Sequence, residues 1–336
     1  MLARVAENIY WLSRYLERAE NTVRLINVHS NLLMDMPDLD EHQSWMPLIS
    51  INGLDEEFAE VHSTASETSV NQFLLADKKN SGSLINAFLA IQVNLRSCRD
   101  ILPKNCYESI NSLCRMVLRQ VESAHRQTPL RMKFLHTVEE KLQAISGSLN
   151  SNMSHDLGYR FLRMGGYLER ADMTSRVIDV QSTRLTATST TGEIMAVQGQ
   201  RWVSVLRTLA AHQMYRQTVR RPVNGRDTLN FLLTDKHLPR SYAFCLNHLD
   251  ESMRGIGLED DRPSQAIATL KNQLMSADFA ALAEDPFALH EFLDDLQLGM
   301  LAVGAAISAT YFPPSSMATV EDEPLSEKPE LVEVTK

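Results

Sequence analysis

Residues 4–26 read RVAENIYWLSRYLERAENTVRLI, and this stretch decides the fold. Its apolar residues recur in alternating steps of four and three, as they do on the buried face of a long α-helix. A second stretch, from Leu157 to Ile178, repeats the same steps. The spacing therefore predicts two equivalent long helices that pack against each other in a bundle. The first stripe consists of Val5, Ile9, Leu12, Leu16, Ala19, Val23 and Ile26.

The chain also contains three internal matches, which occur in the same order in each half. Their offset drifts slowly, from 152 to 158 residues, as small loop insertions accumulate. Matches in this order indicate a duplicated structural unit. The matched pairs are YLERAE 15–20 with YLERAD 167–172, QSW 43–45 with QRW 200–202, and NQFLLADK 71–78 with LNFLLTDK 229–236.

The duplication predicts the domain organisation. Residues 1–150 form the first helical repeat, and residues 151–312 form a second repeat packed on the first. The seam is expected at 146–156, because this segment is polar and rich in Ser and Asn, and Asp156 is expected to cap the following helix. Residues 313–336 are Pro-rich and acidic, which predicts a disordered tail.

The rest of the chain also shows helical periods, and no segment alternates with the period of a β-strand. Ser83 and Ser241, equivalent at an offset of 158, are expected to cap helices after the second pair of matches. The predicted fold class is all-α, a helical bundle made from two tandem copies of one multi-helix unit. Further helices are expected at 69–76, 82–101, 106–125, 130–149, 194–220, 240–254, 263–283 and 286–312.

Composition excludes several classes of function. The formal net charge of −9 gives no general electrostatic reason to bind nucleic acid or anionic lipid. The N-terminus resembles neither a signal peptide nor an anchor, and the apolar run at 298–312 is too short to span a bilayer, so a buried helix is expected there. The four cysteines form no CxxC motif and are expected to be buried reduced thiols. These features predict a cytoplasmic protein.

No cofactor or metal motif is found in the sequence. A di-iron bundle needs two Glu-x-x-His pairs on separate helices, and the chain offers one, at Glu122 and His125. The P-loop, HExxH, dinucleotide and Gly-x-Ser-x-Gly signatures do not occur. We therefore expect neither a metal nor a cofactor.

The repeated Glu-Arg motif has two interpretations, which share the same residues. In the structural one, Glu17 and Arg18 pair with Arg170 and Glu169 of the other copy, or with neighbouring helices, and fix the register of the helices. In the functional one, the motifs form one polar pocket that binds a charged ligand, with Glu17 and Glu169 as candidate acid/base groups. The structural interpretation is favoured because ion-pair networks need not catalyse anything. The other candidate binding residues are Arg14, Arg18, Glu20, Arg24, Arg170, Asp172 and Arg176.

A second strip of polar and aromatic residues runs along the first helix. Asn8, Trp11 and Tyr15 follow helical spacing, so they join the candidate ligand-binding set, although such strips more often describe a helix that is packed on both sides. Arg240, beside the second FLLxDK block, could face the same polar centre.

Together the N-terminal stretch, the repeated YLERA motif and the FLLxDK blocks resemble the bacterial alpha-E family. The resemblance covers residues 1–312 and implies an all-helical protein. It also implies a setting in peptide or amide-bond metabolism, with an ATP-grasp protein and a transglutaminase-like peptidase as partners. The favoured function is an accessory or scaffold protein for an ATP-grasp-type amide ligase, holding a charged peptide or amino acid at the paired motifs. The alternatives are an enzyme that uses the Glu-Arg motif and a structural homo-oligomer.

Overall fold

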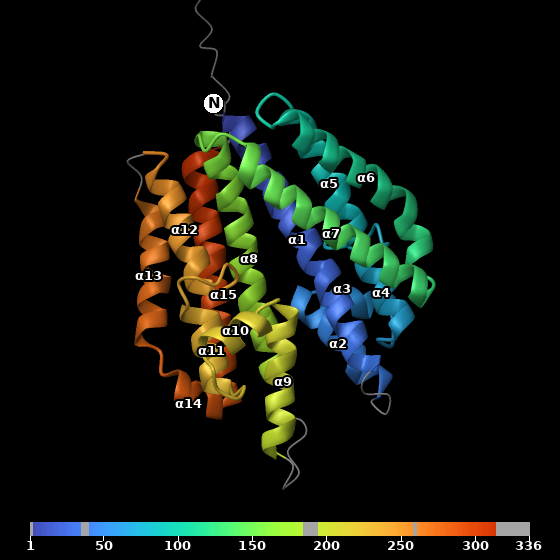
Figure 1. The fold of residues 1–336 in the computed structure, drawn as a ribbon, viewed down its shortest axis with the longest axis vertical. Helices are drawn as coiled ribbons and strands as arrows, with labels where there is room; N and C mark the ends of the chain where they lie inside the picture. The colour runs from blue at the N-terminus through green and yellow to red at the C-terminus, as the bar shows by residue number, and fades with distance from the viewer. Residues whose placement is uncertain (1–2, 35–39, 184–193, 258–260, 314–336) are drawn as a thin grey trace, which may run out of the picture.

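A computed structural model describes residues 3–34, 40–183, 194–257 and 261–313. Within these ranges the protein consists of fifteen helices and no strand, which confirms the predicted all-α class (Figure 1). The helices are α1 (Ala3–Met34), α2 (Glu41–Asn52), α3 (Asp55–Val61), α4 (Glu67–Leu75), α5 (Leu84–Ser97), α6 (Lys104–Ala124), α7 (Thr128–Asn152), α8 (Leu157–Thr183), α9 (Ile194–Thr208), α10 (His212–Thr218), α11 (Gly225–Thr234), α12 (Tyr242–Arg254), α13 (Arg262–Ser276), α14 (Phe279–Glu284) and α15 (Pro286–Tyr311).

The long helices α1 and α8 lie side by side at the centre of the molecule (Figure 1). Both bury most residues of the predicted stripes: Ile9, Leu12 and Ala19 of α1 are fully buried, as are Met164 and Ala171 of α8, whereas Leu157 at the start of α8 is exposed. At roughly 25 cal/mol for each Å² of apolar surface removed from water, such stripes stabilise the bundle. The apolar periodicity thus places both helices in the core.

The other helices are arranged around this central pair. α5 and α7 pack against α1, and α6 packs against α5 and α7. On the opposite side α12 and α15 pack against α8, and α13 packs against α12 and α15 (Figure 1). α2, which follows α1, contacts α8, whereas α9, which follows α8, contacts α1.

The predicted helix caps are present. The hydroxyl of Ser83 accepts a hydrogen bond from the backbone N–H three residues later at 3.4 Å, and Ser241 does the same at 3.0 Å. A carboxylate oxygen of Asp156 accepts from two backbone N–H groups at the start of α8, at 2.9 and 3.3 Å. Each cap satisfies amides that have no partner within the helix, which fixes where the helix begins.

Two of the predicted helices are each divided in two. The interval 194–220 contains α9 and α10, because Ala210 adopts a left-handed conformation, with φ of 52°, that ends the first helix. The interval 263–283 contains α13 and α14, because the carboxylate of Asp278 accepts hydrogen bonds from two amides of a new helix. Periodicity alone did not reveal either break.

The predicted seam is also shorter than expected. α7 continues through Asn152, so only residues 153–156 connect it to α8. The Ser and Asn residues near the end of α7 are mostly solvent-exposed, where a helix tolerates them at little cost. The sequence reasoning did not predict α2, α3 or α11, and the proline inside α2, Pro47, weakens its helical signal. Beyond Pro313, the predicted disordered tail lies outside the described residues.

The apolar helix α15 is only partly buried, in contrast to the buried helix expected there. One face, which includes Leu293 and Val303, packs into the core, whereas Leu298 and Leu301 on the other face are 55% and 59% exposed. In the described ranges α15 is the one helix that is long and apolar enough to cross a membrane. Core helices of soluble proteins can meet the same criteria, so this is weak support for a span.

Candidate functional site

The crossing of α1 and α8 depends on a pair of glycines in α8. A Cβ atom at Gly165 would overlap the backbone carbonyl oxygen of Tyr10, and one at Gly166 would lie 3.0 Å from the hydroxyl oxygen of Ser13. Since glycine has no Cβ, the two backbones approach closely here. Tyr10 meets Gly165 and Glu17 meets Arg170, so the contacts advance in the same direction and the helices run parallel.

Glu17 lies between two arginines that come from other elements. Arg170 of α8 donates two parallel hydrogen bonds to its carboxylate, from Nε at 2.9 Å and from Nη2 at 2.6 Å. Nη1 of Arg240, in the loop before α12, lies 3.3 Å from Oε1 of the same carboxylate. Glu17 is only 6% exposed. The buried charge of Glu17 is therefore paired with two arginines. Such pairing is needed because a buried charge without a partner is costly.

Glu169 occupies the reciprocal position on α8. Arg18 of α1 donates from Nε at 2.5 Å and from Nη2 at 3.1 Å, and Arg14 donates from Nε at 3.0 Å. Glu169 is 3% exposed. The structure thus pairs Glu17 with Arg170 and Glu169 with Arg18, which is the arrangement that the structural interpretation of the motif anticipated.

Further charges extend the network along α1 and into α7. Arg240 donates from Nη2 to Oε1 of Glu20 at 2.9 Å, and Arg24 pairs with the same oxygen. Nε of Arg24 also lies 3.3 Å from Glu139 of α7, which accepts a hydrogen bond from Asn27 at 3.0 Å. The polar centre therefore ties α1 to α7 as well as to α8.

Asp172 and Arg176 form a separate pair on α8. Nε of Arg176 donates to Oδ2 of Asp172 at 2.8 Å, whereas the buried Oδ1 of Asp172 has no hydrogen-bond partner in the described chain. Burial raises the pKa of Asp172 although Arg176 lies beside it. Among the described residues no ion pair joins this pair to Glu17 or Glu169, although Glu169 and Arg14 lie close enough to act electrostatically on the Asp172 carboxylate.

The pKa values show that the central carboxylates are held in their charged form. Burial alone would raise the pKa of Glu17, but Arg170 and Arg240 outweigh it and lower the pKa to about 2. Burial likewise opposes ionisation of Glu169, and Arg18 with Arg14 still lowers its pKa. A general acid or base works best when its pKa lies near the operating pH. The two glutamates are thus poorly tuned for acid/base chemistry at neutral pH.

The aromatic strip covers the Glu169 centre, and Asn8 does not join it. The Arg14 guanidinium lies 4.8 Å from the ring centroid of Trp11, and the Arg18 guanidinium lies 5.6 Å from that of Tyr15. The Asn8 amide instead donates to a backbone carbonyl one turn earlier, at 2.7 Å. The two rings therefore hold arginines that already pair with Glu169.

A small groove opens between α1, α7 and α8 beside the Glu17 centre. Its free volume is about 60 Å³, well below the roughly 300 Å³ or more of typical small-molecule pockets. Glu17, Glu20 and Arg170 lie on its wall, together with Arg163, Tyr159 and Tyr167. The space suits a few water molecules or one small functional group.

The four cysteines are buried and free, as predicted. Burial raises the pKa of the thiols of Cys98, Cys114 and Cys245 to about 12 in each case. Such thiols are inert, because the thiolate is the reactive form. In the part of the chain that the structure describes, no group of three or more His, Cys, Asp or Glu side chains is placed to hold a metal ion.

The sequence reasoning missed four residues around this centre, namely Glu139, Arg163, Gly165 and Gly166. Glu139 gave no signal, because its helix position resembles that of any exposed acid. Arg163 precedes the second motif but matches Trp11 at the offset of 152, so the repeat comparison passed over it. The glycine doublet at 165–166 was a usable signal, since glycine inside a helix is costly unless close packing requires it.

These features define an all-helical class of protein in which two central helices exchange reciprocal Glu–Arg pairs. The chain belongs to the Alpha-E family, whose model matches residues 1–312 and is described as a predicted alpha-helical domain with a conserved ER motif. This match confirms the resemblance drawn from the sequence. The ER motif corresponds here to Glu17–Arg18 and Glu169–Arg170.

Curated relatives add a second finding. The chain is 24% identical over 297 residues to uncharacterised proteins of Mycobacterium bovis and Mycobacterium tuberculosis, and 23% identical to a further one from Mycobacterium tuberculosis. Each match covers 81% of this chain but only 32% of the relative, so the chain spans about a third of those proteins. No solved structure gives a significant match.

Proposed function

We propose that this protein is an accessory or scaffold subunit that works with an ATP-grasp-type amide ligase and a transglutaminase-like peptidase in peptide or amide-bond metabolism. One observation carries the scaffold role: each ER glutamate is buried and accepts hydrogen bonds from two arginines. Charges that satisfy each other have little capacity left for a substrate. The paired motifs therefore lock the bundle and do not act as its reaction centre.

The length of the mycobacterial relatives supports an accessory role. In those proteins the matching region is about a third of the chain, so it is combined with further segments of about twice its length. A module that is joined to other segments in its relatives is expected to work together with other protein parts. The four buried, unpaired thiols fit a reducing, cytoplasmic location.

We also propose that the chain is a tandem duplication of residues 1–150 and 151–312. The packing supports this: α1, α5, α6 and α7 contact one another in the same pattern as α8, α12, α13 and α15. Ser83 and Ser241 cap equivalent helices in the two sets. Parallel central helices are what a twofold axis along the bundle would produce.

The test combines copurification with ligase output. Full-length chain is mixed with an ATP-grasp ligase from the same organism, and complex formation and amide product are measured. The expected results are a stable complex and higher output with the chain present. Glu17→Gln and Glu169→Gln, assayed at temperatures where circular dichroism shows native helix content, are expected to keep output within about twofold. A folded variant that loses more than about tenfold would assign chemistry to the ER centre, and absence of both complex and effect would overturn the accessory role.

A homo-oligomer is a second candidate, which one observation favours. Leu298 and Leu301 expose large apolar side chains on the same face of α15. Exposed apolar patches often mark interfaces. Light scattering on the wild type and on Leu301→Glu tests this: a dimer that the substitution dissociates would support the interface, and a monomeric wild type would exclude it.

A further inference from the structure

Two arginines line the groove, and Arg163 of α8, unlike Arg170, has no ion pair with an acid among the described residues. Its only hydrogen bond from the side chain, in the described chain, is a 3.5 Å contact from Nη1 to Oδ1 of Asn150. Arg170, which lines the same groove, donates two bonds to Glu17 instead. Glu251, an exposed residue that pairs with His248, acts on Arg163 electrostatically but forms no ion pair with it. Arg163 thus presents hydrogen-bond donors that the fold leaves largely unused.

Two tyrosines hold this guanidinium in position. Its carbon lies 4.5 Å from the ring centroid of Tyr167 and 5.6 Å from that of Tyr159. The Tyr159 hydroxyl donates to Asn150 at 2.6 Å, which fixes that ring. Burial lowers the pKa of Arg163, so the fold bears a cost for keeping this charge without compensating it. A side chain that is already ordered loses less entropy when it binds a ligand.

Size and charge narrow the ligand class. About 60 Å³ accommodates a carboxylate with one or two carbons, while the remainder of a longer molecule extends through the open mouth. Glu17 and Glu20 also line the groove, and they would repel a doubly charged phosphate more than a singly charged carboxylate. Arginine suits a carboxylate because its planar fork matches both oxygens.

We propose that the groove between α1, α7 and α8 binds the carboxylate terminus of an amino acid or short peptide, with Arg163 as the principal contact. This inference goes beyond the accessory role, because it concerns the isolated chain. If the chain does not bind a carboxylate, the proposed complex with the ligase is unaffected. If the chain does not form that complex, the proposed carboxylate site is unaffected.

The experiment is a saturation-transfer NMR titration of the full chain with glycylglycine, and the control is glycylglycinamide, which keeps the ammonium group but lacks the carboxylate. Binding of glycylglycine at least about tenfold tighter than of the amide is expected, because only the acid carries a carboxylate. Equal binding of the two would overturn the proposal. Acetate, glycine and inorganic phosphate form further arms: glycine or acetate that competes with the peptide supports a site for free carboxylates, and phosphate that binds more tightly than all of them overturns it.

Variants locate the site. Arg163→Gln is expected to weaken glycylglycine binding about tenfold or more, and Arg163→Lys to weaken it less, since lysine keeps the charge but not the planar fork. Arg160→Gln, one turn earlier on α8 and outside the groove lining, is the matched control and should bind like the wild type. Melting curves verify that each variant is folded. Unchanged binding in a folded Arg163→Gln variant would overturn the assignment.

Discussion

Glu17 and Glu169 occupy matching places in the two central helices, yet their surroundings differ. Each accepts a pair of hydrogen bonds from the arginine of the other motif. The second arginine at Glu169 is Arg14, one turn before Arg18 on the same helix, whereas at Glu17 it is Arg240, from a loop 223 residues away. The motif specifies the reciprocal pair, and the surrounding structure supplies the rest of the charge balance.

Steric constraints explain this difference. At the offset of 152, Arg14 corresponds to Gly166, whose missing side chain leaves room for Ser13 at the helix crossing. An arginine at 166 would have to displace α1. At the offset of 158, Arg240 corresponds to Gly82, where a Cβ would lie 3.2 Å from Leu54. Each half therefore contributes its extra arginine at the position where the other half needs a glycine.

The largest expected effect is that of Glu169→Gln. It leaves Arg14 and Arg18 without a salt bridge to any other carboxylate in the described chain. Removing one partner of a buried ion pair costs about 3–5 kcal/mol, so we expect the free energy of unfolding to fall by about 4 kcal/mol. Urea denaturation measures it. The control is Glu108→Gln, which breaks an exposed pair with Lys104 and should cost less than about 0.5 kcal/mol. A similar small loss at Glu169 would contradict the buried network.

Glu17→Gln is expected to cost somewhat less, about 3 kcal/mol, because Arg240 keeps Glu20 as a partner. The folded-state pKa of Glu17, about 2, lies below its usual value of 4.5, so the ionised carboxylate stabilises the fold. That contribution is complete above about pH 4.5 and is lost as the pH falls toward 2. The stability gap between wild type and variant, measured against pH, should therefore shrink across this window. A gap that does not change with pH would contradict the assignment.

Gly165→Ala tests the close crossing that brings both glutamates to their partners. The added methyl would overlap the carbonyl oxygen of Tyr10, and the helices would have to separate, at an expected cost of about 2–3 kcal/mol. Gly147→Ala on α7 is the matched control, since its Cβ would meet no atom within 4 Å. That control should gain about 0.5–1 kcal/mol, because alanine favours a helix over glycine. Equal changes in melting temperature for both variants would refute the crossing argument.

Arg240→Gln is expected to have the smallest effect, a loss of about 1 kcal/mol. Both of its partners keep another arginine: Glu17 keeps Arg170, and Glu20 keeps Arg24. Burial and the nearby charge of Arg24 lower the pKa of Arg240 to about 10, so its removal also relieves an unfavourable burial. Thermal denaturation of Arg240→Gln, measured in parallel with Glu169→Gln, tests this expected loss of stability. A loss as large as that of Glu169→Gln would contradict this prediction, because it would show that Arg170 and Arg24 do not compensate for the missing Arg240.

The sequence predicted features that depend on short-range spacing. The buried stripes of α1 and α8 and the caps at Ser83, Ser241 and Asp156 follow from residues within a few turns of one another. It failed where a single backbone conformation mattered. The left-handed backbone conformation of Ala210 divides one predicted helix, and the residue type at that position does not indicate this conformation.

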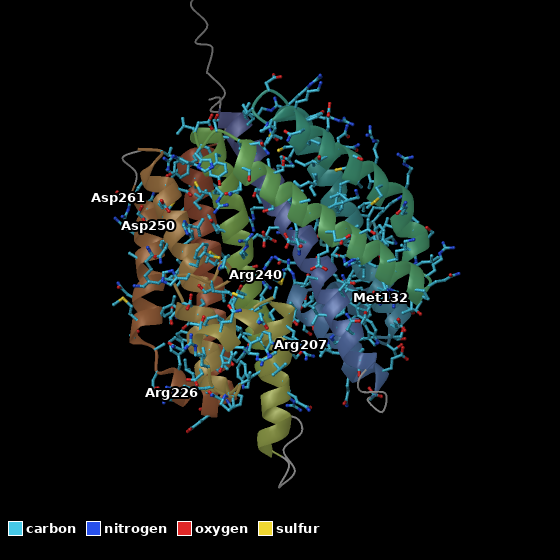
Figure 2. The ribbon with its side chains drawn as sticks, in the orientation of Figure 1. Met132, Arg207, Arg226, Arg240, Asp250 and Asp261 are labelled. Atoms are coloured by element: carbon cyan, nitrogen blue, oxygen red, sulfur yellow. The ribbon has the colours of Figure 1, made fainter. Side chains whose placement is uncertain are left out.

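The sequence by itself determined that this chain is helical and that its Glu-Arg motifs lie at the edge of the apolar stripes, because helix periodicity is a local property of the backbone. Only the tertiary structure decided which further charges join the reciprocal Glu-Arg pairs. Arg240, labelled in Figure 2, reaches Glu17 and Glu20 through the position of a loop. Among the described residues Arg163 has no acid in ion-pair contact, because the packing of α1, α7 and α8 places none beside it. Contacts between distant segments depend on how the helices cross, and that crossing is fixed by packing, such as the missing side chain of Gly165.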